Sequence, residues 1–176
     1  MPEPKCKGLF VAAFVESAGE VSSVFERKAL DILGSHGIED PDPESLYPAE
    51  SFFAAMTETE ENVGRNTAKQ AGEKMIEVNP EIQQMSSAEE GFGELRTQMR
   101  FGFENFSVEE VGQFDIEQLD EGLFRVATVG GWSYPEAFTE GLLSGIVKVT
   151  EDDVRNVSVE QDDTAEDEVL AYEVTW

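Results

Sequence analysis

The sequence predicts an α+β fold in which a helical N-terminal half packs on an antiparallel sheet, with a β-β-α-β-β C-terminal section. Apolar residues repeat at helical spacing through most of the N-terminal half, and the period then changes to the alternation that strands favour. Helices followed by strand pairs around one further helix are typical of an antiparallel sheet covered by helices. The length of 176 residues fits one domain, which we expect over residues 7–176.

The first helices are separated by glycine and proline. The apolar run 7–15 is compatible with a short helix or a strand. Apolar positions recur at helical spacing over 20–33, and Gly34 ends that helix. The prolines and acids of 37–48 predict a loop, and a helix is expected to begin near Ala49.

Two more helices are expected before the aromatic segment. One follows Gly64 and ends at Asn79-Pro80, because the residue before a proline disfavours the helical conformation. Ser87 and Glu90 match a capping box that opens the next helix. An extended segment is then predicted from the aromatic residues Phe101, Phe103 and Phe106.

The C-terminal section alternates strands with one helix. The polar turn 120–122 predicts a hairpin, and Pro135 suits the first turn of a helix over 136–149. The strands are expected at four places, residues 113–119, 123–129, 154–160 and 169–176.

The charge excludes several classes of function. Asp and Glu number 38 against 12 Lys and Arg, which gives a net charge of −26. Phosphate recognition needs clustered basic residues, so we expect no binding to nucleic acid or to membrane. The acids are spread along the chain, as in proteins of salt-in halophiles, where salt screens the self-repulsion. No segment resembles a leader or a membrane span, and a cytoplasmic location is expected.

Cysteine and histidine are each present once. Cys6 excludes an internal disulfide and a multi-cysteine metal site, although its neighbours Lys5 and Lys7 would favour a thiolate. His36 leaves no histidine-based metal cluster and no evident catalytic pair, and we expect no metal site.

The C-terminal third resembles a known family. Residues 138–145, from Phe138 through Gly141 to Gly145, show the F-x-x-G-x-x-x-G rhythm of the 4-vinyl reductase domain. Residues 7–10 and 47–52 look like the opening of the related haem nitric-oxide-binding fold. The resemblance implies a sensory or regulatory domain and a homodimer, and the acid excess predicts an acidic member of haloarchaeal type.

Departures from the family shape the expectation for cofactors. Cysteines that family members often carry are replaced here by Glu136, a residue near Asp163, and Leu170. The haem-binding relatives ligate iron through a helical histidine, whereas His36 lies in a predicted loop. We therefore expect no cofactor, and haem in particular is not expected.

The resemblance also implies an apolar ligand pocket between the helices and the sheet. Pockets of this kind are mostly apolar with a few polar anchors, and Arg100, Arg125 and Tyr134 are candidate anchors. Aromatic residues at such spacing are more often simply part of an ordinary core, and this alternative stays open. The candidate pocket residues are Phe52, Phe53, Met56, Phe101, Phe103, Arg125, Trp132, Tyr134 and Phe138.

Gly141 and Gly145 lie one turn apart on one helix face, where they allow close approach of another backbone. That partner is either an element of the same chain or a second subunit.

Together these features favour a non-enzymatic, small-molecule-binding sensory domain that is a homodimer and takes an apolar ligand. The alternative is a dimeric interaction scaffold without a ligand. An enzyme ranks last, because no nucleotide-binding motif or catalytic constellation is visible.

Overall fold

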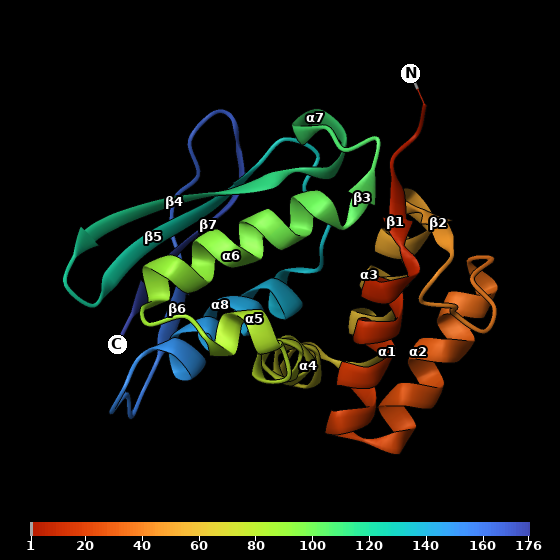
Figure 1. Cartoon of the computed structure of the whole chain (residues 1–176), viewed down its shortest axis with the longest axis horizontal. Helices are drawn as coiled ribbons and strands as arrows, with labels where there is room; N and C mark the ends of the chain where they lie inside the picture. The colour runs from red at the N-terminus through yellow and green to blue at the C-terminus, as the bar shows by residue number, and fades with distance from the viewer. Residues whose placement is uncertain (1) are drawn as a thin grey trace.

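The C-terminal strands form one antiparallel sheet in the computed structural model, which describes residues 2–176 (Figure 1). The strand order is β4-β5-β7-β6, and helix α8 (Glu136–Thr150) connects β5 to β6. The predicted α+β class and the β-β-α-β-β order are confirmed. The strands are β4 (Gln113–Asp120), β5 (Leu123–Val129), β6 (Ser158–Gln161) and β7 (Glu168–Thr175).

Alternation along the central strands places one face of the sheet in the core. Phe124 and Val126 of β5 lie opposite Val174 and Tyr172 of β7, and all four are buried. The predicted strand 154–160 begins later than expected. Ser158 pairs with Thr175, the last residue of β7, so a longer β6 would have no partner.

The helical half divides into two groups in Figure 1. One group lies beside the N-terminal strands and the other lies beneath the sheet with α8. No helix within residues 2–176 is both long enough and apolar enough to cross a membrane. The helices are α1 (Gly8–Val21), α2 (Ser23–Ser35), α3 (Ala49–Val63), α4 (Arg65–Glu77), α5 (Pro80–Gln83), α6 (Ala88–Phe101) and α7 (Val108–Val111).

A small sheet of order β2-β1-β3 was not predicted. Its strands are β1 (Lys5–Lys7), β2 (Leu46–Pro48) and β3 (Phe103–Glu104). Cys6 is completely buried at its centre and pairs with Tyr47 and Phe103, which are remote in sequence. Strands this short carry no periodic signal, and long-range pairing alone forms them.

Two local expectations are wrong because each rested on a local sequence pattern, whereas long-range pairing forms the small sheet. The segment 37–48 was expected to be a loop throughout, yet its end forms β2. Phe101 was placed in an extended segment, yet it is the last residue of α6, and only Phe103–Glu104 is extended.

The capping box is confirmed, because Ser87 Oγ accepts from the Glu90 amide at 3.2 Å. The Glu90 carboxylate accepts from the Ser86 amide at 2.8 Å, one residue earlier than the motif implies.

Helices α4 and α8 pack backbone to backbone. A Cβ on Gly141 would lie 2.0 Å from the Lys69 carbonyl oxygen, and one on Gly145 would lie 3.0 Å from Ile76 Cβ. A Cβ on Gly72 of α4 would lie 2.3 Å from the Phe138 carbonyl oxygen. The glycine face of α8 is thus occupied by α4 of the same chain, so a second subunit has no access to it.

Candidate functional site

Seven aromatic rings meet between the two helical groups, and we call this cluster the aromatic seam. The Phe53 and Tyr134 ring centroids are 4.7 Å apart, those of Trp132 and Tyr134 are 4.9 Å apart, and Phe14 lies 5.9 Å from Phe138. Such separations are typical of favourable aromatic pairs. The members come from α1, α3, β3, the segment before α8, and α8 itself, namely Phe14, Phe52, Phe53, Phe103, Trp132, Tyr134 and Phe138.

The seam brings together most of the predicted pocket residues. Six of its rings belong to that set, and Met56, 2% exposed, lies beside Phe14 and Phe138. Phe14 was missed, because nothing in the apolar run 7–15 indicated which face of its helix would be buried. The structure leaves two predicted members, Phe101 and Arg125, outside the seam.

The seam is closely packed. The space beside Phe14, Met56 and Phe138 is partly open to solvent and has a volume of about 10 Å³. A space of that size holds at most about one water molecule. Ligand binding at the seam therefore stays a prediction, and it requires the packed rings to separate.

Within residues 2–176, two buried side-chain polar atoms have no hydrogen-bond partner, namely Trp132 Nε1 in the seam and the Tyr172 hydroxyl on β7. The Trp132 ring lies between Phe114 and Tyr134, with centroids 4.5 and 4.9 Å away. An unsatisfied buried donor costs about 1–3 kcal/mol, so each such atom needs an explanation in a ligand, a water or a function. Burial raises the pKa of Tyr172, and the carboxylate of Glu140 acts in the same direction.

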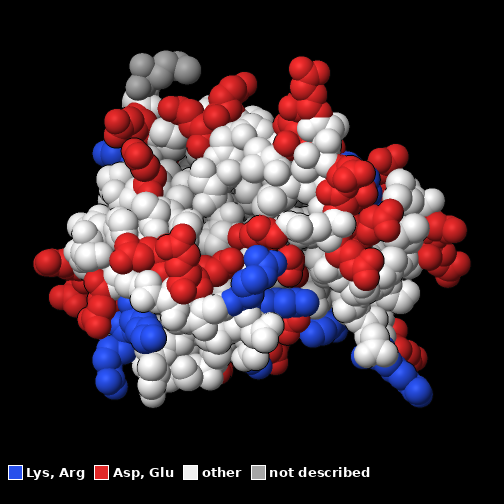
Figure 2. All heavy atoms as spheres, turned by 180° about the vertical axis from the view of Figure 1, so that it is seen from behind, with Lys and Arg blue, Asp and Glu red and all other residues white. Residues whose placement is uncertain are grey.

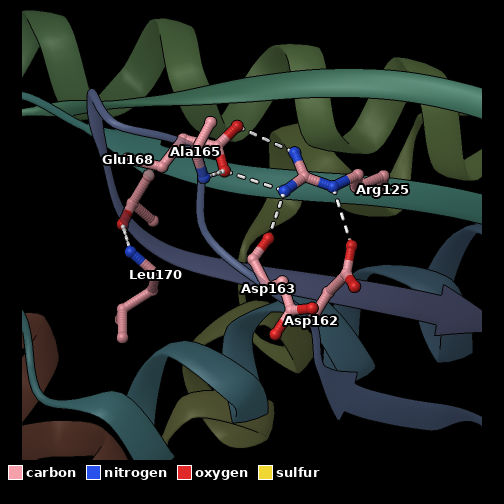
Figure 3. A network of polar contacts seen from close by, with 7 residues as sticks. Arg125, Asp162, Asp163, Ala165, Glu168 and Leu170 are labelled. Carbon is pink, nitrogen blue, oxygen red and sulfur yellow. Dashed lines mark hydrogen bonds and ion pairs between the residues drawn. The ribbon is translucent and has the colours of Figure 1, made fainter.

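Arg125 has a structural role on the opposite face of the sheet (Figure 3). Its guanidinium donates to Asp162 Oδ2 at 2.8 Å and to both carboxylate oxygens of Glu168 at 2.8 Å. It also donates to the Asp163 carbonyl at 2.9 Å. These bonds raise the pKa of Arg125 and lower the pKa of Glu168 to about 2. The expectation that Arg125 anchors a ligand is wrong, because its donors hold the β6–β7 connection.

The environments of Cys6 and His36 oppose a chemical role for either residue. Burial raises the pKa of the Cys6 thiol to about 12, while Lys5 and Lys7 lie on the exposed side of β1. The flanking lysines therefore do not produce a thiolate. His36 Nε2 lies 2.6 Å from Glu58 Oε2, which joins the end of α2 to α3. Within residues 2–176, no group of three or more His, Cys, Asp or Glu side chains is arranged to hold a metal ion.

The acidic residues are dispersed over the surface, as the sequence indicated. Figure 2 shows Asp and Glu side chains scattered over the face seen from behind, with a few basic side chains between them.

Several carboxylates have specific partners. Glu60 accepts from the amides of Ala137 and Phe138 at 3.1 and 3.2 Å, and so caps α8, which has no side-chain cap of its own. No sequence signal indicated this long-range cap.

Comparison with known proteins relates this fold to H-NOX domains. Neither a described family nor a curated protein matches the sequence. An oxygen-binding H-NOX domain related to soluble guanylate cyclases matches with a TM-score of 0.66 and 14% identity, over 96% of this chain and 94% of that chain. A point mutant of the T. tengcongensis H-NOX matches with a TM-score of 0.67 and 16% identity, over 96% of both chains. At these identities the likeness is one of fold.

A further neighbour bears on the cofactor. It comes from work on modulating heme redox potential through porphyrin distortion, and matches with a TM-score of 0.66 and 15% identity, over 97% of this chain and 99% of that chain. Our expectation that this chain has no cofactor, haem included, is wrong in the light of these heme-binding neighbours. The expectation relied on the position of one histidine, whereas the whole fold is shared with heme-binding domains.

The side chains as arranged here do not form a porphyrin site. The space beside Phe14 and Phe138 is about 10 Å³, far smaller than a porphyrin. The larger depression of about 1200 Å³ beside α3 is lined by five glutamates, and no basic residue of the described chain lines it, so it does not suit an anionic porphyrin. The histidine of the chain lies at the end of α2 and is bound to Glu58, away from the seam.

Proposed function

We propose that this protein is a sensory domain that binds a small, largely apolar molecule in the aromatic seam. The observation that carries the proposal is the unpartnered Trp132 Nε1, a buried donor within a cluster of rings. A ligand with one hydrogen-bond acceptor would satisfy this donor and stack against the rings. The H-NOX fold of the neighbours supports the same class of function.

Binding would act by separating the two helical groups. The seam joins α1 and α3 to α8, so a guest between the rings moves these elements relative to one another. A shift of α8 would displace the sheet and change the surface that a partner protein contacts. We propose a non-enzymatic, cytoplasmic domain over 7–176 that acts as a homodimer. The residues 138–145 support a relationship to the 4-vinyl reductase type, and the acidic surface supports a halophilic source.

Native mass spectrometry of the purified protein tests the proposal, together with titration of hemin, the ligand class of the neighbours. We expect a bound small molecule; a hemin absorbance band that saturates at one equivalent would instead show that the packed rings separate widely enough to admit a porphyrin. Trp132→Phe keeps a ring and removes the donor, so it should weaken binding by up to about tenfold, the effect of one hydrogen bond. Trp176→Phe is the matched control, since Trp176 stacks on Phe124 outside the seam.

The proposal fails if no molecule is bound, hemin gives no saturating band, and the two tryptophan variants behave alike. The dimeric scaffold is then the better function, and the closely packed seam favours it. A scaffold would be a stable dimer by light scattering whether or not small molecules are present.

A further inference from the structure

A second site of different chemistry lies between α6 and the start of β4. This groove has a volume of about 400 Å³, within the range of roughly 300–1,000 Å³ of small-molecule sites. Its lining residues come from the C-terminal end of α6 and from both sides of α7; Figure 1 shows where these two helices lie. Its lining residues are Arg96, Thr97, Met99, Arg100, Phe101, Phe106, Gly112, Gln113 and Phe114.

The charge of the groove is opposite to that of the protein. No Asp or Glu among residues 2–176 lines it, although the chain has 38 of them. By contrast, the larger depression beside α3 is lined by five glutamates and by no basic residue of the described chain. The surrounding charge repels anions, so a site that is to hold one must exclude carboxylates from its own walls.

Two guanidinium groups are available in the groove. Arg96 and Arg100 are four residues apart on α6 and thus on the same face. Neither forms an ion pair with a described residue, whereas Arg65 and Arg125 each pair with two carboxylates. In a protein so rich in acids, a pair of neighbouring arginines without carboxylate partners leaves its donors for another anion.

The remaining walls are apolar and aromatic. Phe101 is 68% exposed, which is unusual for so large an apolar side chain, and the buried residues Met99 and Phe114 line the same groove. Phe106 faces the Arg100 guanidinium, with Cζ 6.0 Å from the ring centroid. An aromatic guest would cover the exposed Phe101 ring and extend this arrangement of charge and ring.

We propose that the groove binds a small organic anion that carries an aromatic ring, with its carboxylate on Arg96 and Arg100 and its ring against Phe101 and Phe106. Arginine is suited to this role, because its planar donors match a carboxylate in two parallel hydrogen bonds. The site goes beyond the sensory function proposed above. It needs neither an opening of the seam nor a partner for Trp132.

Benzoate is the probe, followed by amide chemical shifts in NMR spectra of the full chain. We expect saturable shifts at residues 96–101, 106 and 112–114. Acetate carries the charge without the ring, and benzyl alcohol carries the ring without the charge. Each should bind at least about tenfold more weakly than benzoate, since each loses one of the two interactions.

Variants distinguish binding of benzoate in the groove from nonspecific attraction of an anion to positive charge. Arg96→Gln and Arg100→Gln should each weaken benzoate binding about tenfold, the effect of a hydrogen bond to a charged group. Arg27→Gln on α2 is the matched control, because Arg27 is also exposed and also lacks an ion pair within residues 2–176, but lies outside the groove. Phe101→Ala should weaken binding while leaving the melting temperature unchanged, since the ring is exposed.

Three outcomes would overturn the proposal. Benzoate and acetate could bind equally, the Arg27 variant could lose as much affinity as the groove variants, or no shifts could appear in the groove. If a Glu-rich peptide shifts these resonances and benzoate does not, the groove is a docking surface for protein and the small-ligand proposal is wrong.

Discussion

Replacing Gly141 with alanine tests whether α4 and α8 depend on backbone contact. The new Cβ would lie 2.0 Å from the Lys69 carbonyl oxygen and 3.0 Å from Gly72 Cα, both of them backbone atoms. Ordinary contact begins near 3.4 Å, so the helices must separate by about 1.4 Å at this point. Overpacking of this kind costs about 1–3 kcal/mol, and the rigid neighbours place Gly141→Ala near the upper end. Alanine also gains up to about 1 kcal/mol in helix propensity, which offsets part of the cost.

We therefore expect Gly141→Ala to lower the free energy of unfolding by roughly 2 kcal/mol, and the melting temperature by roughly 4–8 °C. Urea unfolding and thermal melting, both followed by circular dichroism, measure the two quantities. Gly93→Ala is the matched control, because Gly93 is also helical but has nothing within 4 Å of the added Cβ. It should gain up to about 1 kcal/mol from propensity alone.

A double variant sharpens the test. Gly72→Ala alone should also destabilise, since its Cβ would lie 2.3 Å from the Phe138 carbonyl oxygen. Once the helices have separated for one methyl group, the second should fit more easily, so the double variant should lose less than the sum. The reasoning is refuted if Gly141→Ala and Gly93→Ala change stability by the same amount and sign.

Three further predictions concern charge. Glu60→Gln should lower stability by about 1 kcal/mol by weakening the cap of α8, measured by urea unfolding; an unchanged midpoint would contradict the cap. Arg125 lowers the pKa of Glu168 in the folded state to about 2, so the stability this carboxylate contributes is present above its unfolded pKa near 4.5 and is lost as the pH falls towards 2. Glu168→Gln should remove that part of the acid sensitivity between these pH values, whereas Glu16→Gln, at an exposed site, should not. Finally, raising KCl to about 2 M should increase the melting temperature, because salt screens the self-repulsion of a chain with net charge −26; a constant melting temperature would argue against a halophilic design.

Elements with a local signal were predictable. The helix after Pro135 follows from the periodicity of 136–149 and from a residue suited to the first turn, and α8 occupies 136–150. The hairpin at 120–122 follows from its glycine, which has a φ of +70° in the turn. By contrast, β1 exists because Cys6 pairs with Tyr47 and Phe103, and no local pattern predicts such contacts.

The candidate sites show the same difference between what the local sequence predicts and what the tertiary structure decides. Six of the predicted pocket rings were identified from their residue types and do meet in the seam. Phe101 has the same type of side chain but lies outside the seam, and so does the predicted anchor Arg125. Phe101 ends a helix at the groove, and the register of β5 directs Arg125 to the outer face. Residue type indicates what a side chain can bind, whereas helix phase and strand register decide what it faces.

The amino-acid sequence by itself determined the fold class, the acidic surface and the aromatic residues available to a core or a pocket. Periodicity, charge and residue type can all be read along the chain without knowing which residues meet in space. Only the tertiary structure decided that the glycines of α8 face α4, that the rings close into a packed seam, and that two arginines border a groove without acids. These features depend on atoms that are distant in sequence and meet only when the helices pack on the sheet.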